Sequence, residues 1–429
     1  MLAYFKTVVS EHFKMTSKIN IQLKDAQYIP RDFYQTNAVA HIIQSDQEAI
    51  EVAQKLALEF AKEASQRDHE RRLPLDEIQQ YSASGLWGIT IPQAFGGAGV
   101  SYKTLAEVVK IISSVDSSLG QIAQNHWAFL EHIRLDASPE QQAFFFDQVL
   151  QGKRFGNAFS EKGSKTVADL STTIDFHADH AVINGQKFFA TGALLAHWVP
   201  VVAVNDGKPY AALVPQHTPG LTVINDWSGF GQRNTASGSV VLDQVKVDLK
   251  YVVPIYQAFE RPTAAGAISQ FIQSAVDAGI ARGAIQETIQ YVRQYSRPWI
   301  DSGLEKASQD PYTIANIGEL KIKSRAAEAV LDLAGEAIDR AVAEATEEHV
   351  AEATLLTAES KVLTTEVALL AANKLFELAG TRSTLSELNL DRYWRNARTH
   401  TLHDPVRWKL NLVGNYYLND IALPRHAWS

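Results

Sequence analysis

A chain of 429 residues is long enough to bury a large core and to hold two or three domains. Its 46% hydrophobic and 21% charged residues are typical of globular proteins, and 40 basic against 48 acidic residues give a formal net charge of −8. This balance offers no basic surface for nucleic acid, and the absence of cysteine excludes disulfides, thiolate metal ligands and a cysteine nucleophile. With no apolar run as long as a membrane span, the sequence predicts a cytoplasmic protein that binds neither nucleic acid nor membrane.

Residues 1–37 are expected to form an N-terminal extension. The segment from Met1 to Lys14 mixes charge into a short apolar stretch and lacks a small-residue cleavage site, which argues against a signal peptide. Met15 opens a polar stretch and is an alternative start, so the sequence leaves open whether the first 14 residues belong to the protein.

Helical spacing dominates residues 38–153, which we expect to form an N-terminal helical domain. Ser45 and Glu48 form a capping-box pattern ahead of apolar residues that recur at helical spacing. Pro74 suits the first turn of a short helix and Gly85 its end, and the stretch 138–141 predicts the start of a further helix.

Short apolar runs separated by turn signals follow in residues 154–262 and predict a middle β domain. Asn184-Gly185 predicts a hairpin turn, and Asn205-Asp206-Gly207 and Thr218-Pro219-Gly220 end two further runs. Strands at this spacing are typical of a small sandwich or barrel.

Helical spacing returns in residues 263–429 and predicts a C-terminal four-helix bundle. Its helices are expected over 263–296, 313–345, 348–379 and 404–419, with breaks near Pro298, Pro311 and Gly380. The fold class is therefore α+β, with a β domain between two helical ones.

The densest group of residues that could take part in catalysis or metal binding lies near the C-terminus. His400 and His403 share one face of a helical turn, and Asp404 can orient an imidazole or act as a base. From spacing alone, a polar helix end with arginines in structural ion pairs is favoured over catalysis. The cluster lacks the further ligands that a metal site needs, so we expect no metal. His126 lies in an apolar helix, where a histidine is typically a core residue.

Glycine-rich segments offer a second kind of site. Residues 156–161 and 187–192 suit close approach to a planar cofactor, but from the residues alone an ordinary strand end and turn explains them better. The glycines of 95–99 do not form a G-x-G-x-x-G pattern after a strand, and the chain has no Walker pattern. This excludes a Rossmann nucleotide site and a P-loop.

Several segments together resemble the acyl-CoA dehydrogenase superfamily, whose three domains match the helical, β, helical order. Pro92–Gly99 resembles its P-x-x-x-G-G-x-G element. Within the superfamily the chain is similar to the dibenzothiophene monooxygenase branch, and most of all to SfnB-type sulfur-acquisition oxidoreductases. The segments that carry this likeness are Gln124–His126, Phe155–Ala158, Asp226–Arg233, Arg297–Ile300 and Asp391–Pro405.

The resemblance implies a flavin between the β domain and the C-terminal bundle. Asn157 and Thr191 match residues near the flavin ring, and Arg297 matches an arginine that reaches the flavin phosphate of a neighbouring subunit in a homotetramer. His403 matches the histidine of oxygen activation, with Asp404 beside it. The remaining matched histidines of the active site are His126 and His400.

The activity that the resemblance implies is that of a two-component monooxygenase. Reduced FMN comes from a separate flavin reductase, and dioxygen and a small organosulfur compound are the substrates, in sulfur acquisition.

The sequence departs from the dehydrogenase pattern in two places. Asp404-Pro405 stands where dehydrogenases have a catalytic glutamate followed by glycine. Residues 297–301 replace an Arg-x-x-Phe-Gly pattern that holds the adenylate half of FAD, which favours FMN over FAD. Two alternatives stay open: an FAD-dependent acyl-CoA dehydrogenase with Asp404 as base, and a non-catalytic flavin-binding protein of the same fold. The sequence does not identify the substrate.

Overall fold

The computed structural model describes residues 29–35 and 39–428. Met1–Phe33 form one unit and Tyr34–Ser429 a second. Of the first unit, residues 29–33 are described. Its last three residues belong to the 3₁₀ turn η2 (Arg31–Tyr34). Most of the expected extension over residues 1–37, including the alternative start at Met15, lies outside the described residues. The elements below all belong to the second unit.

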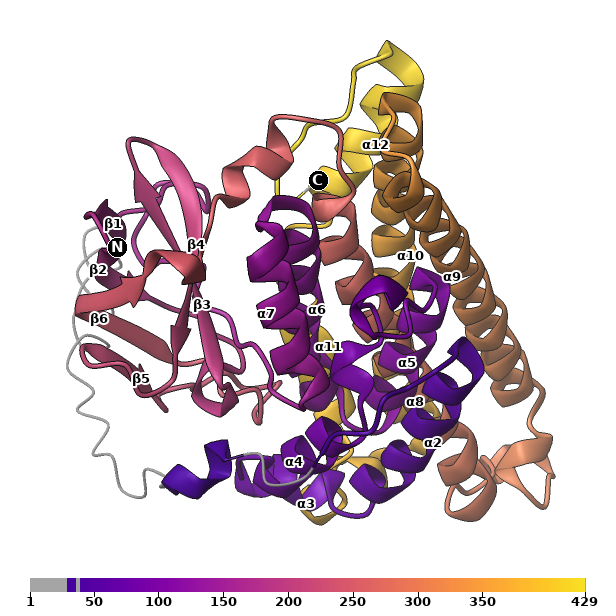
Figure 1. Ribbon diagram of the computed structural model, residues 1–429. Coiled ribbons are helices and arrows are strands. Elements are labelled where there is room, and N and C mark those ends of the chain that lie inside the picture. The colour runs from indigo at the N-terminus through magenta and orange to yellow at the C-terminus, as the bar shows by residue number, and fades with distance from the viewer. Residues whose placement is uncertain (1–28, 36–38, 429) are drawn as a thin grey trace, which may run out of the picture. The chain divides into compact units, whose positions relative to one another are not determined.

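The N-terminal part of this unit is helical, as expected (Figure 1). Its α-helices are α2 (Asp46–Ala61), α3 (Ala64–Glu70), α4 (Leu75–Ala83), α5 (Tyr102–Val115), α6 (Ser117–Asp136) and α7 (Pro139–Leu150).

The ends of these helices follow the local sequence. Ser138 and Gln141 form a complete capping box at the start of α7. At α2, Ser45 accepts from Glu48 N, but the Glu48 carboxylate turns to Gln44 N, so only half of the expected box forms. Gly85 follows α4 with a φ of +83°, and a Cβ there would lie 2.0 Å from a carbonyl oxygen of the preceding segment.

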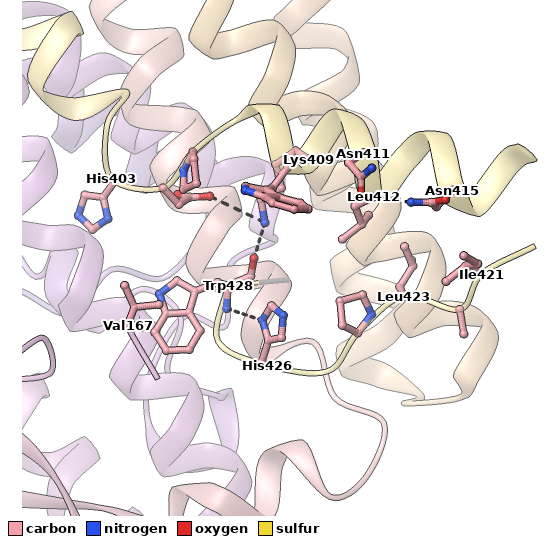
Figure 2. A pocket seen from close by; sticks show the side chains of 15 residues that line it. Val167, His403, Lys409, Asn411, Leu412, Asn415, Ile421, Leu423, His426 and Trp428 are labelled. Atoms are coloured by element: carbon pink, nitrogen blue, oxygen red, sulfur yellow. Dashed lines mark hydrogen bonds and ion pairs between the residues drawn. The ribbon is translucent and has the colours of Figure 1, made fainter. Parts of the chain in front are cut away.

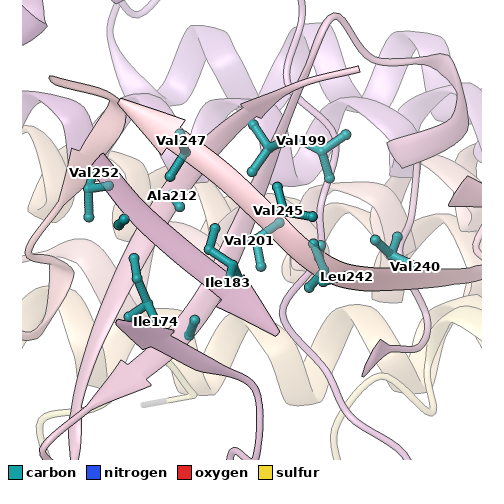
Figure 3. Close-up of a cluster of buried hydrophobic side chains, with 14 of the residues drawn as sticks. Ile174, Ile183, Val199, Val201, Ala212, Val240, Leu242, Val245, Val247 and Val252 are labelled. Atoms are coloured by element: carbon teal, nitrogen blue, oxygen red, sulfur yellow. The ribbon is translucent and has the colours of Figure 1, made fainter. Parts of the chain in front are cut away.

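The middle of the chain forms one seven-stranded mixed sheet. Its strands are β1 (Thr173–Phe176), β2 (His180–Lys187), β3 (Trp198–Asn205), β4 (Lys208–Pro215), β5 (Leu221–Ile224), β6 (Ser239–Asp248) and β7 (Val252–Val253), in the order β5-β6-β2-β1-β3-β4-β7. The sequence analysis expected a small sandwich or barrel, and the described residues instead form one sheet with edge strands β5 and β7. Its valines, isoleucines, leucine and alanines meet in one apolar cluster (Figure 3).

One turn signal is confirmed and another is wrong. Asp206 and Gly207, with φ of +48° and +75°, connect β3 to β4. Asn184-Gly185, expected as a hairpin turn, lies inside β2, where the register against β6 shifts between Ile183 and Gly185. Asn184 Oδ1 accepts from Gln244 N across this bulge. The extra residue lies in β6, where Asp243 and Gln244 face Asn184 alone, so the Asn-Gly pair continues β2 opposite a bulge instead of reversing the chain.

The C-terminal region contains the four expected helices, and a further short helix precedes the last of them. Three helices are long: α8 (Ala265–Gln294), α9 (Pro311–Ala343) and α10 (Glu347–Ala379). They are followed by the shorter helices α11 (Asp391–His400) and α12 (Arg407–Asn419). Pro311 begins α9 at its first position. Pro405 disfavours a helical conformation at Asp404, where α12 was expected to begin, and the helix begins at Arg407.

Packing between these parts positions the site. Helix α8 packs against α5, α6, α9, α10 and α11. Figure 1 shows α6 and α7 between the sheet and the long C-terminal helices, so α6 is in place to carry side chains toward both regions. Across the described ranges 29–35 and 39–428, no helix is both long and apolar enough to cross a membrane.

Candidate active site

His403 lies in the turn between α11 and α12, and its ring faces two amides. Its Nε2 is 3.1 Å from Gln121 Nε2 of α6, and its Nδ1 is 3.1 Å from Gln273 Nε2 of α8. The ring is accessible from a cavity, yet protein surrounds it closely enough that burial, with the nearby charges of His400 and Lys361, lowers its pKa. At neutral pH His403 is therefore a neutral imidazole that a small molecule can reach.

His400 lies deeper, at the end of α11, and is only 2% exposed. Its Nδ1 is 2.5 Å from Asp277 Oδ1 of α8, and its Nε2 is 2.8 Å from Gln121 Oε1. Lys361 of α10 donates to the other Asp277 oxygen at 3.1 Å. Burial by itself raises the pKa of Asp277, but Lys361 and His400 outweigh it and bring the pKa to about 2. Asp277 is therefore a carboxylate that holds His400 in place.

Asp404 follows His403 and is held from two other sides. Lys409 Nζ of α12 lies 3.9 Å from Asp404 Oδ2. With the Gln270 amide oriented to place its nitrogen toward the carboxylate, that nitrogen donates to both Asp404 oxygens at 3.1 and 3.2 Å. In the described part of the chain, no hydrogen bond joins Asp404 to His403. The carboxylate is thus engaged by α8 and α12.

A cavity of about 420 Å³ opens beside His403 (Figure 2). Most of its lining comes from α12 and the C-terminal segment, with Val167 from the β region. Trp428 lines it and stacks on Phe159, with ring centroids 5.4 Å apart and an interplanar angle of 19°. Lys409 donates to the Trp428 carbonyl, which ties the C-terminal segment to α12. The volume is within the range of small-molecule sites, and the lining is mainly apolar.

His126 is not part of this group. Its Nε2 lies 2.9 Å from the Trp87 carbonyl, and its Nδ1 accepts from Phe155 N at 3.0 Å. The ring is fully buried, which lowers its pKa to about 3, so it is a neutral imidazole with both nitrogens bound to backbone. His126 thereby fixes the segment that carries Asn157, two residues beyond Phe155.

Asn157 and Thr191 lie on adjacent segments of the β region. Gly156 allows this, because a Cβ there would lie 2.6 Å from Ala193 Cα. Asn157 is 8% exposed, and its amide makes no hydrogen bond with the rest of the described chain. The Thr191 hydroxyl pairs with Ser237 Oγ at 2.7 Å. Asn157 thus presents an unpaired polar group next to a tightly packed backbone.

Arg297 lies away from this cluster, just after α8. It is exposed and forms no ion pair within residues 29–35 and 39–428. Its neighbours Trp299 and Ile300 are 73% and 86% exposed. The structure therefore does not bring Arg297 to the site of its own chain.

The arginine-rich helix α11 contains structural ion pairs. Arg395 donates to Asp68 at 2.6 Å, to Asp391 at 2.6 Å and to the Phe230 carbonyl at 3.1 Å. Asn396 Oδ1 accepts from the backbone of the same loop at 2.7 Å. These contacts fix the loop 226–233 against α11. In the described ranges, no group of His, Asp or Glu side chains is arranged to hold a metal ion.

Sequence reasoning missed the partners of the two histidines. Asp277 and Lys361 stand alone in apolar helical stretches, and a lone charge on a buried face signals a buried partner, but not which one. Gln121 and Gln273 carry no such signal. The stacking of Trp428 on Phe159 joins residues 269 positions apart, which no local pattern reveals.

Comparison with known proteins places these features in a family. The acyl-CoA dehydrogenase N-terminal, middle and C-terminal domain models match residues 44–153, 157–245 and 271–408. The chain is 33% identical over 382 residues to a probable FMNH2-dependent monooxygenase, SfnC, of Pseudomonas putida, covering 87% of this chain and 95% of that protein. It is 34% identical over 387 residues to the dibenzothiophene monooxygenase of Mycolicibacterium goodii, covering 86% and 93%.

A solved structure agrees with these sequence matches. The FMN-bound TdsC of Paenibacillus sp. A11-2 superposes with a TM-score of 0.85 at 33% identity, covering 89% of this chain and all of that one. Domain models, relatives and structure therefore agree, and the chain belongs to the acyl-CoA dehydrogenase family.

Proposed function

We propose that the protein is a flavin-dependent monooxygenase that uses reduced FMN and dioxygen to oxygenate a small organosulfur compound. The observation that carries this is His403, a neutral imidazole held by two amides at the edge of a largely apolar cavity. The names of the similar proteins, an FMNH2-dependent monooxygenase and a dibenzothiophene monooxygenase, support it. A separate flavin reductase supplies the reduced FMN in this proposal.

The polar groups of the site suit FMN. The Asn157 amide is nearly buried and unpaired within the described residues, so it can bind a polar group of the flavin. We assign Asn157 and Thr191 to the flavin ring, and the Arg297 guanidinium of a neighbouring subunit to the phosphate. When bound, reduced FMN supplies two electrons, which allow one atom of dioxygen to enter the sulfur compound while the other leaves as water.

The remaining groups place protons and exclude water. His403 holds a proton on one ring nitrogen and accepts a hydrogen bond on the other, so it can give or take a proton at the cavity edge. Trp428, which stacks on Phe159, gives one side of the cavity an apolar surface, which protects oxygen chemistry from water. Asp404 is ion-paired to Lys409, which does not favour a role as the base of a dehydrogenase.

Isotope labelling tests this function directly. We expect the apo protein to bind FMN at least about tenfold more tightly than FAD, because residues 297–301 lack the adenylate-binding pattern. With chemically reduced FMN, ¹⁸O₂ and dibenzothiophene or a dialkyl sulfide, mass spectrometry should find one ¹⁸O atom in the sulfoxide. Tighter binding of FAD with oxidation of an acyl-CoA, or no binding of either flavin, would contradict the proposal.

We propose that the assembly is a homotetramer in which Arg297 completes the site of a neighbouring chain. Its exposure beside the exposed apolar residues Trp299 and Ile300 supports a place at a subunit interface. Mixing Arg297→Ala protein with His403→Ala protein should restore activity above the sum of the two, because a hybrid site then has both groups. No rescue on mixing, or a flavin-binding monomer by light scattering, would rule this arrangement out.

A further inference from the structure

The two histidines of the site are joined by a single amide. Gln121 of α6 places Oε1 2.8 Å from His400 Nε2 and its Nε2 3.1 Å from His403 Nε2. Gln121 is 3% exposed, so both ends of its amide depend on these contacts. A primary amide has one accepting and one donating end, so its orientation decides what each imidazole must do.

One orientation requires a charged His400. With Gln121 as placed, His400 donates from Nε2 to the amide oxygen and from Nδ1 to Asp277, so both its nitrogens carry protons. His403 then accepts at Nε2 from the amide nitrogen and carries its own proton on Nδ1. A rotated Gln273 amide, whose oxygen has no partner among the described side chains and backbone, accepts that proton.

The opposite orientation requires a neutral His400. If the Gln121 amide rotates by half a turn, its nitrogen donates to His400 Nε2, which therefore carries no proton. His403 now donates from Nε2 to the amide oxygen, and its Nδ1 accepts from Gln273 Nε2 at 3.1 Å. Both arrangements satisfy every contact. They differ by one proton on His400 and by which nitrogen of His403 is protonated.

We propose that Gln121 couples the charge of His400 to the tautomer of His403, and that Asp277 and Lys361 are positioning residues that hold His400 for this purpose. The inference rests on the proposed role of His403. Lys361 and Asp277 are both fully buried and 3.1 Å apart, so Asp277 keeps a fixed charge and a fixed direction toward His400.

The charge of Asp277 beside the pair is fixed, so the proton that distinguishes the two arrangements is the one on His400. Asp277 stays ionised because its pKa is about 2, and the pKa of His403 is lowered. Burial lowers the pKa of Lys409 to about 8, against the opposing effect of Asp404, so Lys409 is charged below that pH. The titratable and charged groups that face the pair are Asp277 of α8, Lys361 of α10, Asp404 before α12, Lys409 of α12 and His426 of the C-terminal segment.

Solid-state ¹⁵N NMR of the histidine-labelled apo protein tests the coupling without flavin. Signals of His400 and His403 are assigned with His400→Gln and His403→Gln. As the pH falls, we expect His400 to gain its second proton at the same midpoint at which the proton of His403 moves from Nε2 to Nδ1. Gln121→Leu should abolish the change at His403 while His400 still titrates. A His403 that keeps one tautomer while His400 titrates would overturn the proposal.

Matched variants separate coupling from folding. Gln124→Leu changes a neighbouring amide of α6 that contacts Ser269, and should leave both titrations unchanged. Removing both buried charges in Asp277→Asn with Lys361→Met should move both midpoints together to lower pH, because His400 loses its carboxylate. Midpoints that move apart while Gln121 is intact would contradict the coupling.

The outcome is distinguishable from a failure of the proposed function. Coupled midpoints with full product yield in His403→Ala would leave the coupling in place and remove His403 from the reaction. Uncoupled midpoints together with loss of product in His403→Ala would reject the coupling and keep His403 in the reaction. In the loaded enzyme, the pH profile of product formation should follow the His403 midpoint and lose that dependence in Gln121→Leu.

Discussion

Replacing His403 with alanine is expected to lower product formation by about 10²-fold or more, the range for a lost acid–base group. FMN binding and folding should stay nearly intact, since the ring faces a cavity and water from that cavity can take its place beside the amides of Gln121 and Gln273. The measurement is the yield of oxygenated product per bound FMN. Asp404→Asn should do less damage, because the carboxylate contacts Lys409 rather than the ring.

The acid side of the wild-type pH–activity profile gives a second test of the role of His403. Because its surroundings lower the pKa of His403 from 6.5, the ring stays neutral to a lower pH than a free imidazole. Protonation of the His403 ring therefore does not remove activity near pH 6.5, and this loss occurs as the pH falls through the lowered pKa.

A distant histidine provides the control. His180 at the start of β2 pairs with Asp179, which is 89% exposed, and His180→Ala should leave yield and melting temperature unchanged. If His403→Ala lowers the melting temperature but not the yield per folded site, His403 only packs the helix end. His400 is then the remaining histidine of this cluster, whereas His126 lies outside it with both nitrogens bound to backbone.

Replacing Arg67 with alanine is expected to destabilise the protein by about 3–5 kcal/mol. The Arg67 side chain is fully buried and binds Glu77 at 2.5 Å and Asp116 at 2.7 Å. Its loss leaves two carboxylates, 10% and 6% exposed, without their cation. Asp116 also caps α6 through Ser118 N and Leu119 N, so the change weakens the helix that carries Gln121.

Urea unfolding at one fixed protein concentration measures this effect. Arg72→Ala is the matched control, because Arg72 pairs with Glu63 at side-chain exposures of 34% and 55%. A surface pair of this kind contributes about 1 kcal/mol or less. Equal losses in both variants would show that the buried cluster around Arg67 is no more important than a surface ion pair.

Short-range patterns determine most of the secondary structure. The capping box of Ser138 and Gln141, the left-handed Gly85 and the Asp206-Gly207 turn are where the sequence places them, because each depends on a few adjacent residues. The prediction of a turn at Asn184-Gly185 was wrong for the opposite reason. An Asn-Gly pair can also lie within a strand opposite a bulge, and only the pairing of β2 with β6 decides between the two.

In the candidate site, too, some features follow from the sequence and others only from the tertiary structure. The sequence by itself determined the family and identified His400, His403 and Asp404 as one reactive segment, because these residues are adjacent in the chain. Only the tertiary structure decided their partners. It gave His400 the carboxylate of Asp277, 123 positions away, and His403 the amides of Gln121 and Gln273. It also bound both nitrogens of His126 to backbone. Proton positions in a site follow from hydrogen-bond partners, and packing between helices decides those partners.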